Sequence, residues 1–236
     1  MKKFFSLAIC VMAMLFVGCG KNDSSAKVSS DKGAETKEKS STENGHEYVD
    51  LGLSVKWATC NVGASKPEEY GDYFAWGETQ PKDYYDWSTY KWCNGSMNTQ
   101  TKYCTDSNYG IVDDKTVLEA ADDAATANWG GAWRMPTGEE YYELRHNCTW
   151  ELTTQNGVNG YKVTGTNGNS IFLPAAGGRY LSDLSYAGRN GYYWSSLLGT
   201  DAPFLACSLD FFYSGFVEVD YDNGRHNGLS VRPVCP

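Results

Sequence analysis

The sequence WRMPTGEEYYELR, at residues 133–145, joins an extended segment to a helix. Thr137 is a favoured helix N-cap, and Glu140 three residues later has the spacing of a capping box. Pro136 disfavours helical backbone at the residue before it, so the segment that ends at Pro136 should be extended and should lead straight into the helix. The junction therefore predicts a helix that begins after Thr137 and carries Tyr141 to Arg145.

A second helix is predicted immediately before this junction. Residues Asp114–Asn128 are rich in Ala and space their apolar side chains as a helix does, and the acidic pair Asp113-Asp114 stands at their start.

Short apolar runs bounded by Gly, Asn and Asp fill much of the remaining sequence and predict strands. These runs are Tyr48–Leu51, Val55–Thr59, Tyr73–Ala75, Tyr161–Thr164, Ser170–Leu173, Tyr192–Ser195, Phe204–Phe212, Phe216–Val219 and Leu229–Val234. Asn167-Gly168 and Asp222-Asn223-Gly224 are predicted hairpin turns, because these residue types tolerate positive φ. Two helices and a long antiparallel region predict an α+β fold, in which the helices pack on antiparallel sheets. The loop-rich Gly77–Tyr109 stretch either carries ligand contacts or only covers the surface.

The N-terminus has the pattern of a bacterial lipoprotein signal. Lys2 and Lys3 precede an apolar run of about 14 residues, which is shorter than the roughly 20 that span a bilayer, and Phe16-Val17-Gly18-Cys19 ends it. We expect residues 1–18 to be a signal peptide and Cys19 to be lipidated. This places the protein at a membrane through a lipid anchor, as an outer membrane lipoprotein facing the cell surface or the periplasm.

A polar segment follows the signal. Residues 19–46 contain no aromatic side chain and are rich in Ser, Lys and Glu, so they cannot bury enough apolar surface to offset the entropy of ordering. We predict a disordered tether over 19–46 and one globular domain over 47–236.

The domain is acidic and rich in aromatic residues. Residues 1–46 hold 7 of the 20 basic residues and 5 of the 29 acidic residues, so the rest of the chain carries a net charge of −11. Nucleic acid is therefore not an expected partner. All 8 Trp and 17 Tyr lie in the domain. Rings that the core does not use would suit binding to a sugar or a peptide.

Six cysteines lie in the domain, and an even number in an exported chain favours disulfides. They are Cys60, Cys93, Cys104, Cys148, Cys207 and Cys235. The spacing leaves the pairing open, and partly free thiols stay possible. Metal binding is the weaker interpretation, because no CxxC pair is present and no His flanks a cysteine at zinc-finger spacing.

The chemical motifs of common enzymes are missing: the sequence has no GxSxG, Walker loop, HExxH or GxGxxG before a helix. The segment 220–227 gathers carboxylates, amides and a ring as a sugar site does, although a plain polar hairpin turn is the favoured interpretation. The candidate ligand-binding residues are Tyr192, Tyr193, Trp194, Tyr221, Asp222, Asn223 and Arg225.

Acidic residues gather at the first predicted helix. Asp113, Asp114, Glu119 and Asp123 could form half of a calcium site, whereas a helix N-terminus that favours acidic residues explains the same pattern. No cofactor is expected apart from this possible calcium ion. Arg134, Arg179 and Arg232 lie in apolar surroundings, and we expect them to pair with carboxylates of the domain.

Six sequence blocks carry a family resemblance. In chain order they are WATCNVGA (57–64), YGDYFAWGET (70–79), WRMPT (133–137), LPAAG (173–177), YWSS (193–196) and SVRPV (230–234). Through them, residues 48–235 resemble the Fibrobacter succinogenes major paralogous domain family. This resemblance implies an exported or surface lipoprotein of Bacteroidetes-like bacteria, and it implies no particular activity. In the family pattern Cys93, Cys207 and Cys235 are less regular than the other three cysteines.

More distantly, the helix pair, the late strands and the YWSS and SVRPV blocks resemble the C-type-lectin-like fold. Carbohydrate-binding domains, variable ligand-binding proteins and the formylglycine-generating oxidases share that fold, and a shared fold does not by itself carry function.

Three functions are compatible with these patterns. The leading hypothesis is a tethered, non-enzymatic module that binds a glycan or another macromolecular ligand. The second is a redox enzyme in which Cys207 and Cys235 act as a cysteine pair, as the oxidase relatives of the fold imply. The third is a self-associating structural or adhesive surface protein.

Overall fold

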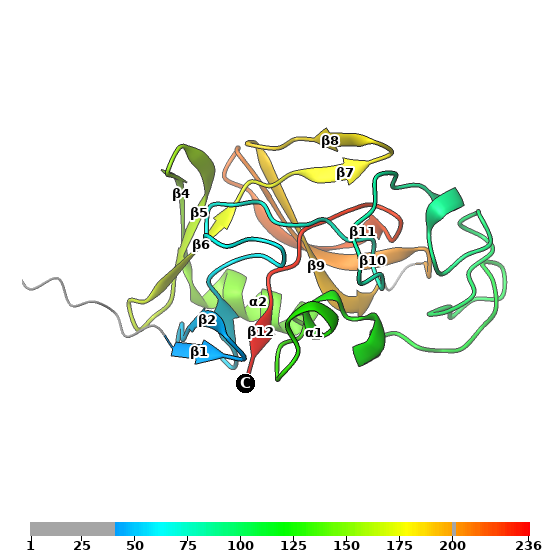
Figure 1. Ribbon diagram of the computed structural model, residues 1–236, viewed down its shortest axis with the longest axis horizontal. Coiled ribbons are helices and arrows are strands. Elements are labelled where there is room, and N and C mark those ends of the chain that lie inside the picture. The colour runs from blue at the N-terminus through cyan, green and yellow to red at the C-terminus, as the bar shows by residue number, and fades with distance from the viewer. Residues whose placement is uncertain (1–40, 200–201) are drawn as a thin grey trace, which may run out of the picture. The chain divides into compact units, whose positions relative to one another are not determined.

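A three-stranded antiparallel sheet forms the centre of the fold (Figure 1). The computed structural model describes residues 41–199 and 202–236. The sheet contains β9 (Asn190–Leu198), β10 (Leu205–Phe212) and β11 (Val217–Gly224), in the order β11-β10-β9. Successive side chains of a strand point to opposite faces, so the sheet has two distinct faces. Tyr193 and Leu209 point to one face, and Tyr192 and Asp210 point to the other.

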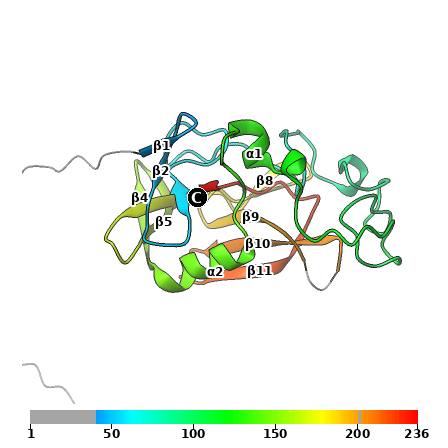
Figure 2. The ribbon, with the colours of Figure 1, turned by 90° about the horizontal axis from the view of Figure 1, so that it is seen from below.

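Helix α2 (Gly138–Asn147) covers the first of these faces, and Figure 2 shows it along β10 and β11. Its buried residues Tyr141 and Leu144 join Tyr193 and Leu209 in one apolar cluster. The predicted capping box is confirmed: Glu140 N donates to Thr137 Oγ1 at 3.2 Å, and Thr137 N donates to Glu140 Oε2 at 2.8 Å. The helix therefore begins where the sequence places it.

The second predicted helix is much shorter than expected. Helix α1 is Ala124–Trp129, and a 3-10 turn, Ala120–Asp122, precedes it. The prediction of a helix from residue 114 is wrong, because the backbone of this segment bonds to β9 instead. Leu118 N donates to Ser196 O at 2.9 Å, and Leu198 N donates to Thr116 O at 2.8 Å. These bonds to a neighbouring strand replace the helical ones.

Further short sheets surround the central one. A second three-stranded sheet has the order β4-β5-β6, from β4 (Thr149–Gln155), β5 (Val158–Thr164) and β6 (Ser170–Pro174). The predicted Asn167-Gly168 turn joins β5 to β6, with Gly168 at φ 87°. A hairpin of β7 (Gly178–Tyr180) and β8 (Asp183–Ser185) precedes β9. Each of these pairs is antiparallel.

The two ends of the described chain meet in one sheet. Its order is β1-β2-β3-β12, from β1 (Ser41–Glu43), β2 (His46–Val49), β3 (Lys56–Ala58) and β12 (Val234–Cys235). Residues 41–46, which we predicted to be tether, are therefore part of the fold. The His46 ring stacks on Trp129 with centroids 3.8 Å apart, and Trp133 Nε1 donates to Glu43 O at 2.8 Å. The signal peptide and Cys19 lie outside the described residues.

Three other strand and turn predictions need correction. Tyr73–Ala75 forms only an isolated bridge, between Phe74 and Leu229. In Leu229–Val234 the only residue within a named strand is Val234. Asp222-Asn223-Gly224 is not a turn, because Asn223 and Gly224 pair with Ala206 and Leu205 of β10. The β10–β11 turn lies at 213–216 instead.

Antiparallel sheets with two α-helices place the domain in the α+β to mostly-β class. The loop-rich Gly77–Tyr109 stretch holds one 3-10 turn, Trp87–Thr89, and extends from one end of the domain (Figure 1, right). In the described part of the chain, no helix combines the length and the apolar character that a bilayer crossing requires.

Candidate ligand-binding face

A buried carboxyl group, Asp210, lies at the centre of the sheet face that α2 does not cover. Asp210 is only 3% exposed and pairs across the sheet with Tyr192 of β9 and Glu218 of β11. Ser208 Oγ donates to Asp210 Oδ1 at 2.7 Å, and Asn223 Nδ2 donates to Asp210 Oδ2 at 3.0 Å. No ion pair among the described residues includes Asp210.

Burial raises the pKa of Asp210 to about 7, because a low-dielectric environment disfavours the charged carboxylate. The bonds from Ser208 and Asn223 oppose this effect, whereas the negative charges of Asp220 and Glu218 add to it. Glu218 and Asp220 are half-buried on the same sheet face. This face is therefore acidic at its rim and holds a carboxyl group that changes charge near neutral pH.

Aromatic residues lie on the same sheet face as this carboxyl group. Tyr192 receives a hydrogen bond on its hydroxyl oxygen from Asn190 Nδ2 at 2.6 Å, and its ring meets Phe212 edge-on with centroids 6.2 Å apart. The Phe212 and Phe216 ring centroids are 6.1 Å apart. Phe216 is 51% exposed. The rings thus run from the sheet interior to solvent.

The β7–β8 hairpin supplies the other side of the ring set. Burial raises the pKa of Tyr180, and the ionisable groups of Tyr192 and Asp210 add to this rise. Tyr186, just after β8, adds to the rise in the pKa of both Tyr180 and Tyr192, and it is 57% exposed. We define the Asp210 face as Tyr180, Tyr186, Asn190, Tyr192, Ser208, Asp210, Phe212, Phe216, Glu218, Asp220 and Asn223.

Of the predicted ligand-binding residues, Asn223 and Tyr192 belong to this face; Asn223 is half-buried, and Tyr192 is only 8% exposed. Tyr193, Trp194 and Arg225 are fully buried, so their assignment to an exposed binding surface is corrected. Tyr193 Oη donates to Pro174 O at 2.6 Å, and Trp194 Nε1 donates to Phe74 O at 2.7 Å, which makes both rings part of the core.

The two remaining predicted residues lie elsewhere. Tyr221 points to the α2 side of the sheet and lines a hollow of about 480 Å³ with Leu197 and Glu139. Asp222 is exposed on β11. Asp210 was not among the predicted residues, because it lies inside an apolar run of the sequence and only the strand register places it opposite Tyr192.

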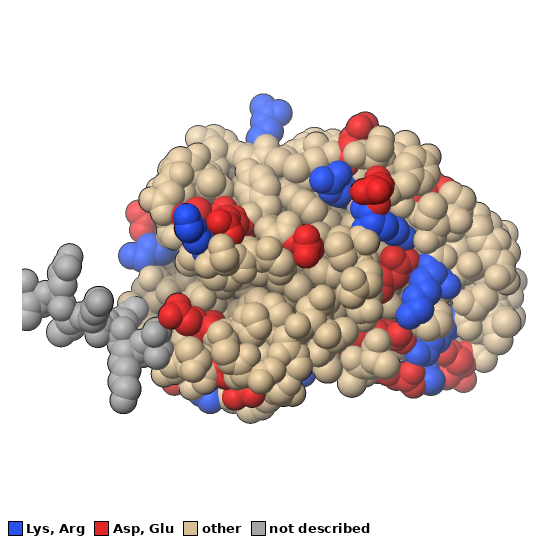
Figure 3. Space-filling model, in the orientation of Figure 1, with Lys and Arg blue, Asp and Glu red and all other residues tan. Residues whose placement is uncertain are grey.

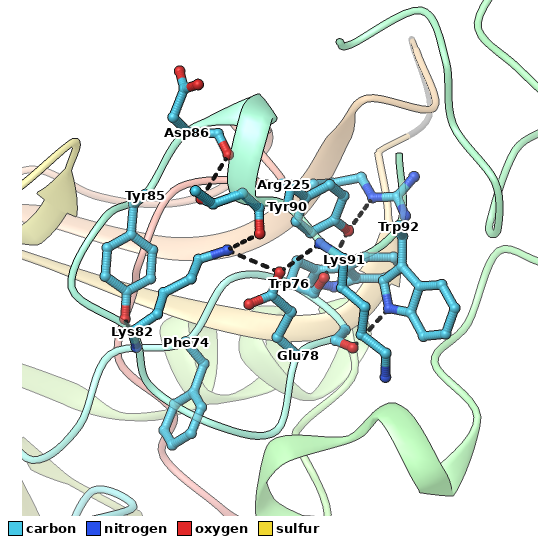
Figure 4. A network of polar contacts seen from close by, with 12 residues as sticks. Phe74, Trp76, Glu78, Lys82, Tyr85, Asp86, Tyr90, Lys91, Trp92 and Arg225 are labelled. Atoms are coloured by element: carbon cyan, nitrogen blue, oxygen red, sulfur yellow. Dashed lines mark hydrogen bonds and ion pairs between the residues drawn. The ribbon is translucent and has the colours of Figure 1, made fainter. Parts of the chain in front are cut away.

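Arg225 anchors the Gly77–Tyr109 loop rather than a ligand (Figure 4). Its Nε donates to Tyr90 Oη at 2.8 Å, and its two terminal nitrogens donate to the carbonyl oxygens of Lys102, Tyr103 and Pro203. Tyr90 Oη in turn donates to Trp76 O at 2.7 Å. Every guanidinium nitrogen therefore has a protein acceptor.

Glu78 fixes the start of the same loop. Its Oε1 accepts hydrogen bonds from Lys82 Nζ at 2.9 Å and from Lys91 N at 2.8 Å, and Figure 4 shows this carboxylate between the two chain segments. Trp92 Nε1 donates to Gly77 O at 2.8 Å. The long loop is thus held by hydrogen bonds to its own backbone.

The predicted calcium ligands do not converge. Asp113 accepts the backbone N–H groups of Tyr103 and Cys104, and Asp123 caps α1. Glu119 pairs with Lys102 and Lys115, whose hydrogen bonds lower its pKa to about 2. Asp114 is exposed in a left-handed backbone conformation at φ 54°. Among the described residues, no group of three or more acidic, His or Cys side chains could hold a metal ion.

The six cysteines of the domain are all free thiols, so the disulfide prediction is corrected. They are Cys60, Cys93, Cys104, Cys148, Cys207 and Cys235. Cys207 and Cys235 belong to different apolar clusters, which removes them as a redox pair in this structure. Burial raises the pKa of Cys207 to about 11, so its thiol is not an activated nucleophile at neutral pH.

The three predicted arginine pairs have different outcomes. Arg134 binds Glu140 through two hydrogen bonds of 2.5 and 2.8 Å, as expected. Arg232 is fully buried and donates instead to Asn61 Oδ1 and to two backbone carbonyls. Arg179 has no carboxylate within ion-pair distance among the described residues, and its Nη1 reaches Ser182 O at 3.5 Å.

Comparison with known proteins gives no further assignment. No protein-family model, curated protein or solved structure matches the chain.

Proposed function

We propose that the protein is a membrane-tethered, non-catalytic module that binds a glycan on the Asp210 face. The observation that carries this proposal is the exposure of two rings of the Asp210 face, Tyr186 and Phe216, together with the half-buried amide and carboxylate side chains of Asn223, Glu218 and Asp220 on the same face. The C-type-lectin-like fold and the Fibrobacter succinogenes major paralogous domain resemblance belong to the same proposal.

The chemistry of the face suits an uncharged sugar. A ring presents an apolar surface to the C–H groups of a sugar, and amide and carboxyl groups exchange paired hydrogen bonds with its hydroxyls. Glu218 and Asp220 at the rim would repel an acidic glycan. A neutral saccharide is therefore the favoured ligand class.

The tether completes the proposal. The lipoprotein pattern that ends at Cys19 would attach the chain to a membrane through a lipid, at the cell surface or on the periplasmic face of the outer membrane. Mass spectrometry of the protein isolated from membranes tests this, because lipidation adds acyl chains to Cys19 and removes residues 1–18.

A glycan array tests the binding function. The folded unit 39–236 is applied with calcium and again with a chelator, and the Tyr186→Ala/Phe216→Ala variant is applied beside it. Tyr142→Ala is the matched control, because Tyr142 is 38% exposed on α2, at the other side of the sheet. We expect neutral glycans to bind the wild type and the control. The double variant should lose this binding, although its melting temperature should equal that of the wild type.

Two results would contradict the proposal. Equal binding by the double variant would show that the ligand sits elsewhere. The second result is that no glycan binds and that the sedimentation coefficient of the wild type rises with protein concentration, whereas that of the double variant does not. This would show that these rings mediate self-association.

A further inference from the structure

Arg179 differs from Arg134, Arg225 and Arg232 in its hydrogen bonds. Arg134, Arg225 and Arg232 each donate two or more hydrogen bonds of 3.1 Å or shorter. Within the described chain, Arg179 has one hydrogen-bond acceptor, Ser182 O, at 3.5 Å. A guanidinium has five N–H donors, so most of those on Arg179 have no protein acceptor.

The guanidinium of Arg179 lines a hollow of about 320 Å³. The hollow lies between β7 and the start of the long loop, and its lining includes Asp72, Tyr73, Lys82, Asp83 and Tyr85. A volume of this size is at the lower end of the range for small-molecule sites. Arg179 and Tyr180 are successive residues of β7 and point to opposite sides, so this hollow and the Asp210 face are separate.

The walls of the hollow are fixed by hydrogen bonds. The Arg179 guanidinium lies over the Tyr73 ring, 5.4 Å from its centroid. Tyr73 Oη donates to Ala176 O at 2.6 Å, and Tyr85 Oη donates to Tyr73 O at 2.5 Å. Tyr85 and Leu181 exchange both backbone hydrogen bonds, at 2.8 and 3.0 Å. A ligand would therefore meet a site that is already organised.

Basic and acidic side chains both line this hollow, and in the described part of the protein they form no ion pairs with one another across it. Lys82 is already paired with Glu78 at 2.9 Å. In the described ranges, the Asp72 and Asp83 side chains take part in no ion pair, and neither lies within 4.0 Å of Arg179. Figure 3 shows basic and acidic side chains close together to the right of centre, and another group of them on the left of this face.

Asp72 is held in place by the backbone beside it. Asp72 N donates to Val62 O at 2.9 Å. Its carboxylate packs so closely on Gly63 that a Cβ at this residue would come within 2.4 Å of Oδ2, and Gly63 has a φ of 82°. The carboxylate is thus positioned by a glycine that no other residue could replace without strain.

We infer that this hollow binds a small zwitterion that carries both an ammonium and a carboxylate group, such as a free α-amino acid. Arg179 takes the carboxylate through paired N–H donors, and the Asp72 and Asp83 carboxylates take the ammonium. A ligand with only one of these charges would leave the opposite charge of the hollow without a partner.

Calorimetry of the purified protein with the standard free L-α-amino acids tests this inference. We expect at least one amino acid to bind, and its N-acetyl and amide derivatives, which lack one charge each, to bind at least about tenfold more weakly. Arg179→Gln and Asp72→Asn should each weaken binding to a similar degree. Arg189→Gln is the matched control, because Arg189 is exposed and does not line the hollow.

Three outcomes would overturn the inference: no amino acid binds at millimolar concentration, the acetylated derivative binds equally well, or Arg179→Gln binds as the wild type does. Urea unfolding of each variant checks that it is folded. Because glycan binding is assigned to the opposite side of β7, the Tyr186→Ala/Phe216→Ala variant should keep amino-acid binding, so the two proposals fail independently.

Discussion

Asn223 Nδ2 and Asp210 Oδ2 lie 3.0 Å apart on neighbouring strands, and this amide is one of only two side-chain donors to the carboxyl group among the described residues. An amide stabilises a carboxylate less than a cation does. Burial therefore outweighs both donors, and the pKa of Asp210 rises to about 7. The centre of the sheet consequently contains a group whose charge depends on physiological pH.

Asp210 should make the protein less stable as pH rises. The unfolded chain loses this proton near its ordinary pKa of 3.8, and the folded protein loses it near 7, so the folded state binds more protons between these values. The free energy of unfolding should fall across this window by up to about 4 kcal/mol from this group. Urea unfolding at pH 4 and pH 8 measures the fall.

Asp210→Asn should remove most of this pH dependence, whereas Glu218→Gln should reduce it only slightly, because burial contributes more than Glu218 does to the raised pKa of Asp210. An equal decrease in Asp210→Asn and in the wild type would show that Asp210 is not the titrating group.

Glu140 should matter more to stability than its neighbour Glu139. Glu140 completes the capping box and also binds Arg134 through two hydrogen bonds, whereas Glu139 is exposed in the same turn of α2. We expect Glu140→Ala to lower the free energy of unfolding by about 2–3 kcal/mol and Glu139→Ala to change it by less than about 0.5 kcal/mol. Equal effects in urea unfolding would contradict the assignment.

Arg225→Lys should loosen the long loop. One ammonium cannot reach the Tyr90 hydroxyl and three carbonyl oxygens that the planar guanidinium serves, so acceptors become unsatisfied. We expect a loss of about 3 kcal/mol or more and faster hydrogen exchange at residues 100–104. Arg189→Lys, at an exposed position, provides the control. Unchanged exchange in Arg225→Lys would show that the loop is held by other contacts.

The rate at which each cysteine reacts with a thiol reagent should follow its burial. Cys60 and Cys148 are half-buried, and the other four are buried, so these two should react first in the native protein without reductant. Burial raises the pKa of Cys148 to about 11, which keeps the reactive thiolate scarce at pH 8. Cys60 should therefore label before Cys148. A disulfide found by mass spectrometry in the unreduced protein would contradict this structure.

The sequence predicted the structure correctly where hydrogen bonds join residues that are close together in the chain. The capping box of α2 and the Asn167-Gly168 turn involve residues only a few positions apart, and both were predicted correctly. Residues 114–119 have helical composition, yet their backbone bonds to β9, which lies far along the sequence. A propensity cannot reveal a distant strand that competes for the same N–H groups.

The candidate site could be predicted only in part for a similar reason, because it depends on pairing between strands. Tyr192 and Asn223 were predicted as ligand residues, but the sequence could not separate them from Tyr193 and Trp194, because the face of a residue depends on its position in the strand. The position of Asp210 opposite Tyr192 follows only from the strand register.

The pairing of Val234 with Trp57 has a consequence for how the protein is made. These residues lie at nearly opposite ends of the described sequence, and Arg232 from the same region donates to Asn61 Oδ1 at 2.8 Å. Contacts of such long range form slowly, because the intervening chain must first be brought together. The sheet of β1, β2, β3 and β12 can be completed only after residue 234 has been synthesised, so the nascent chain keeps this sheet open until that point.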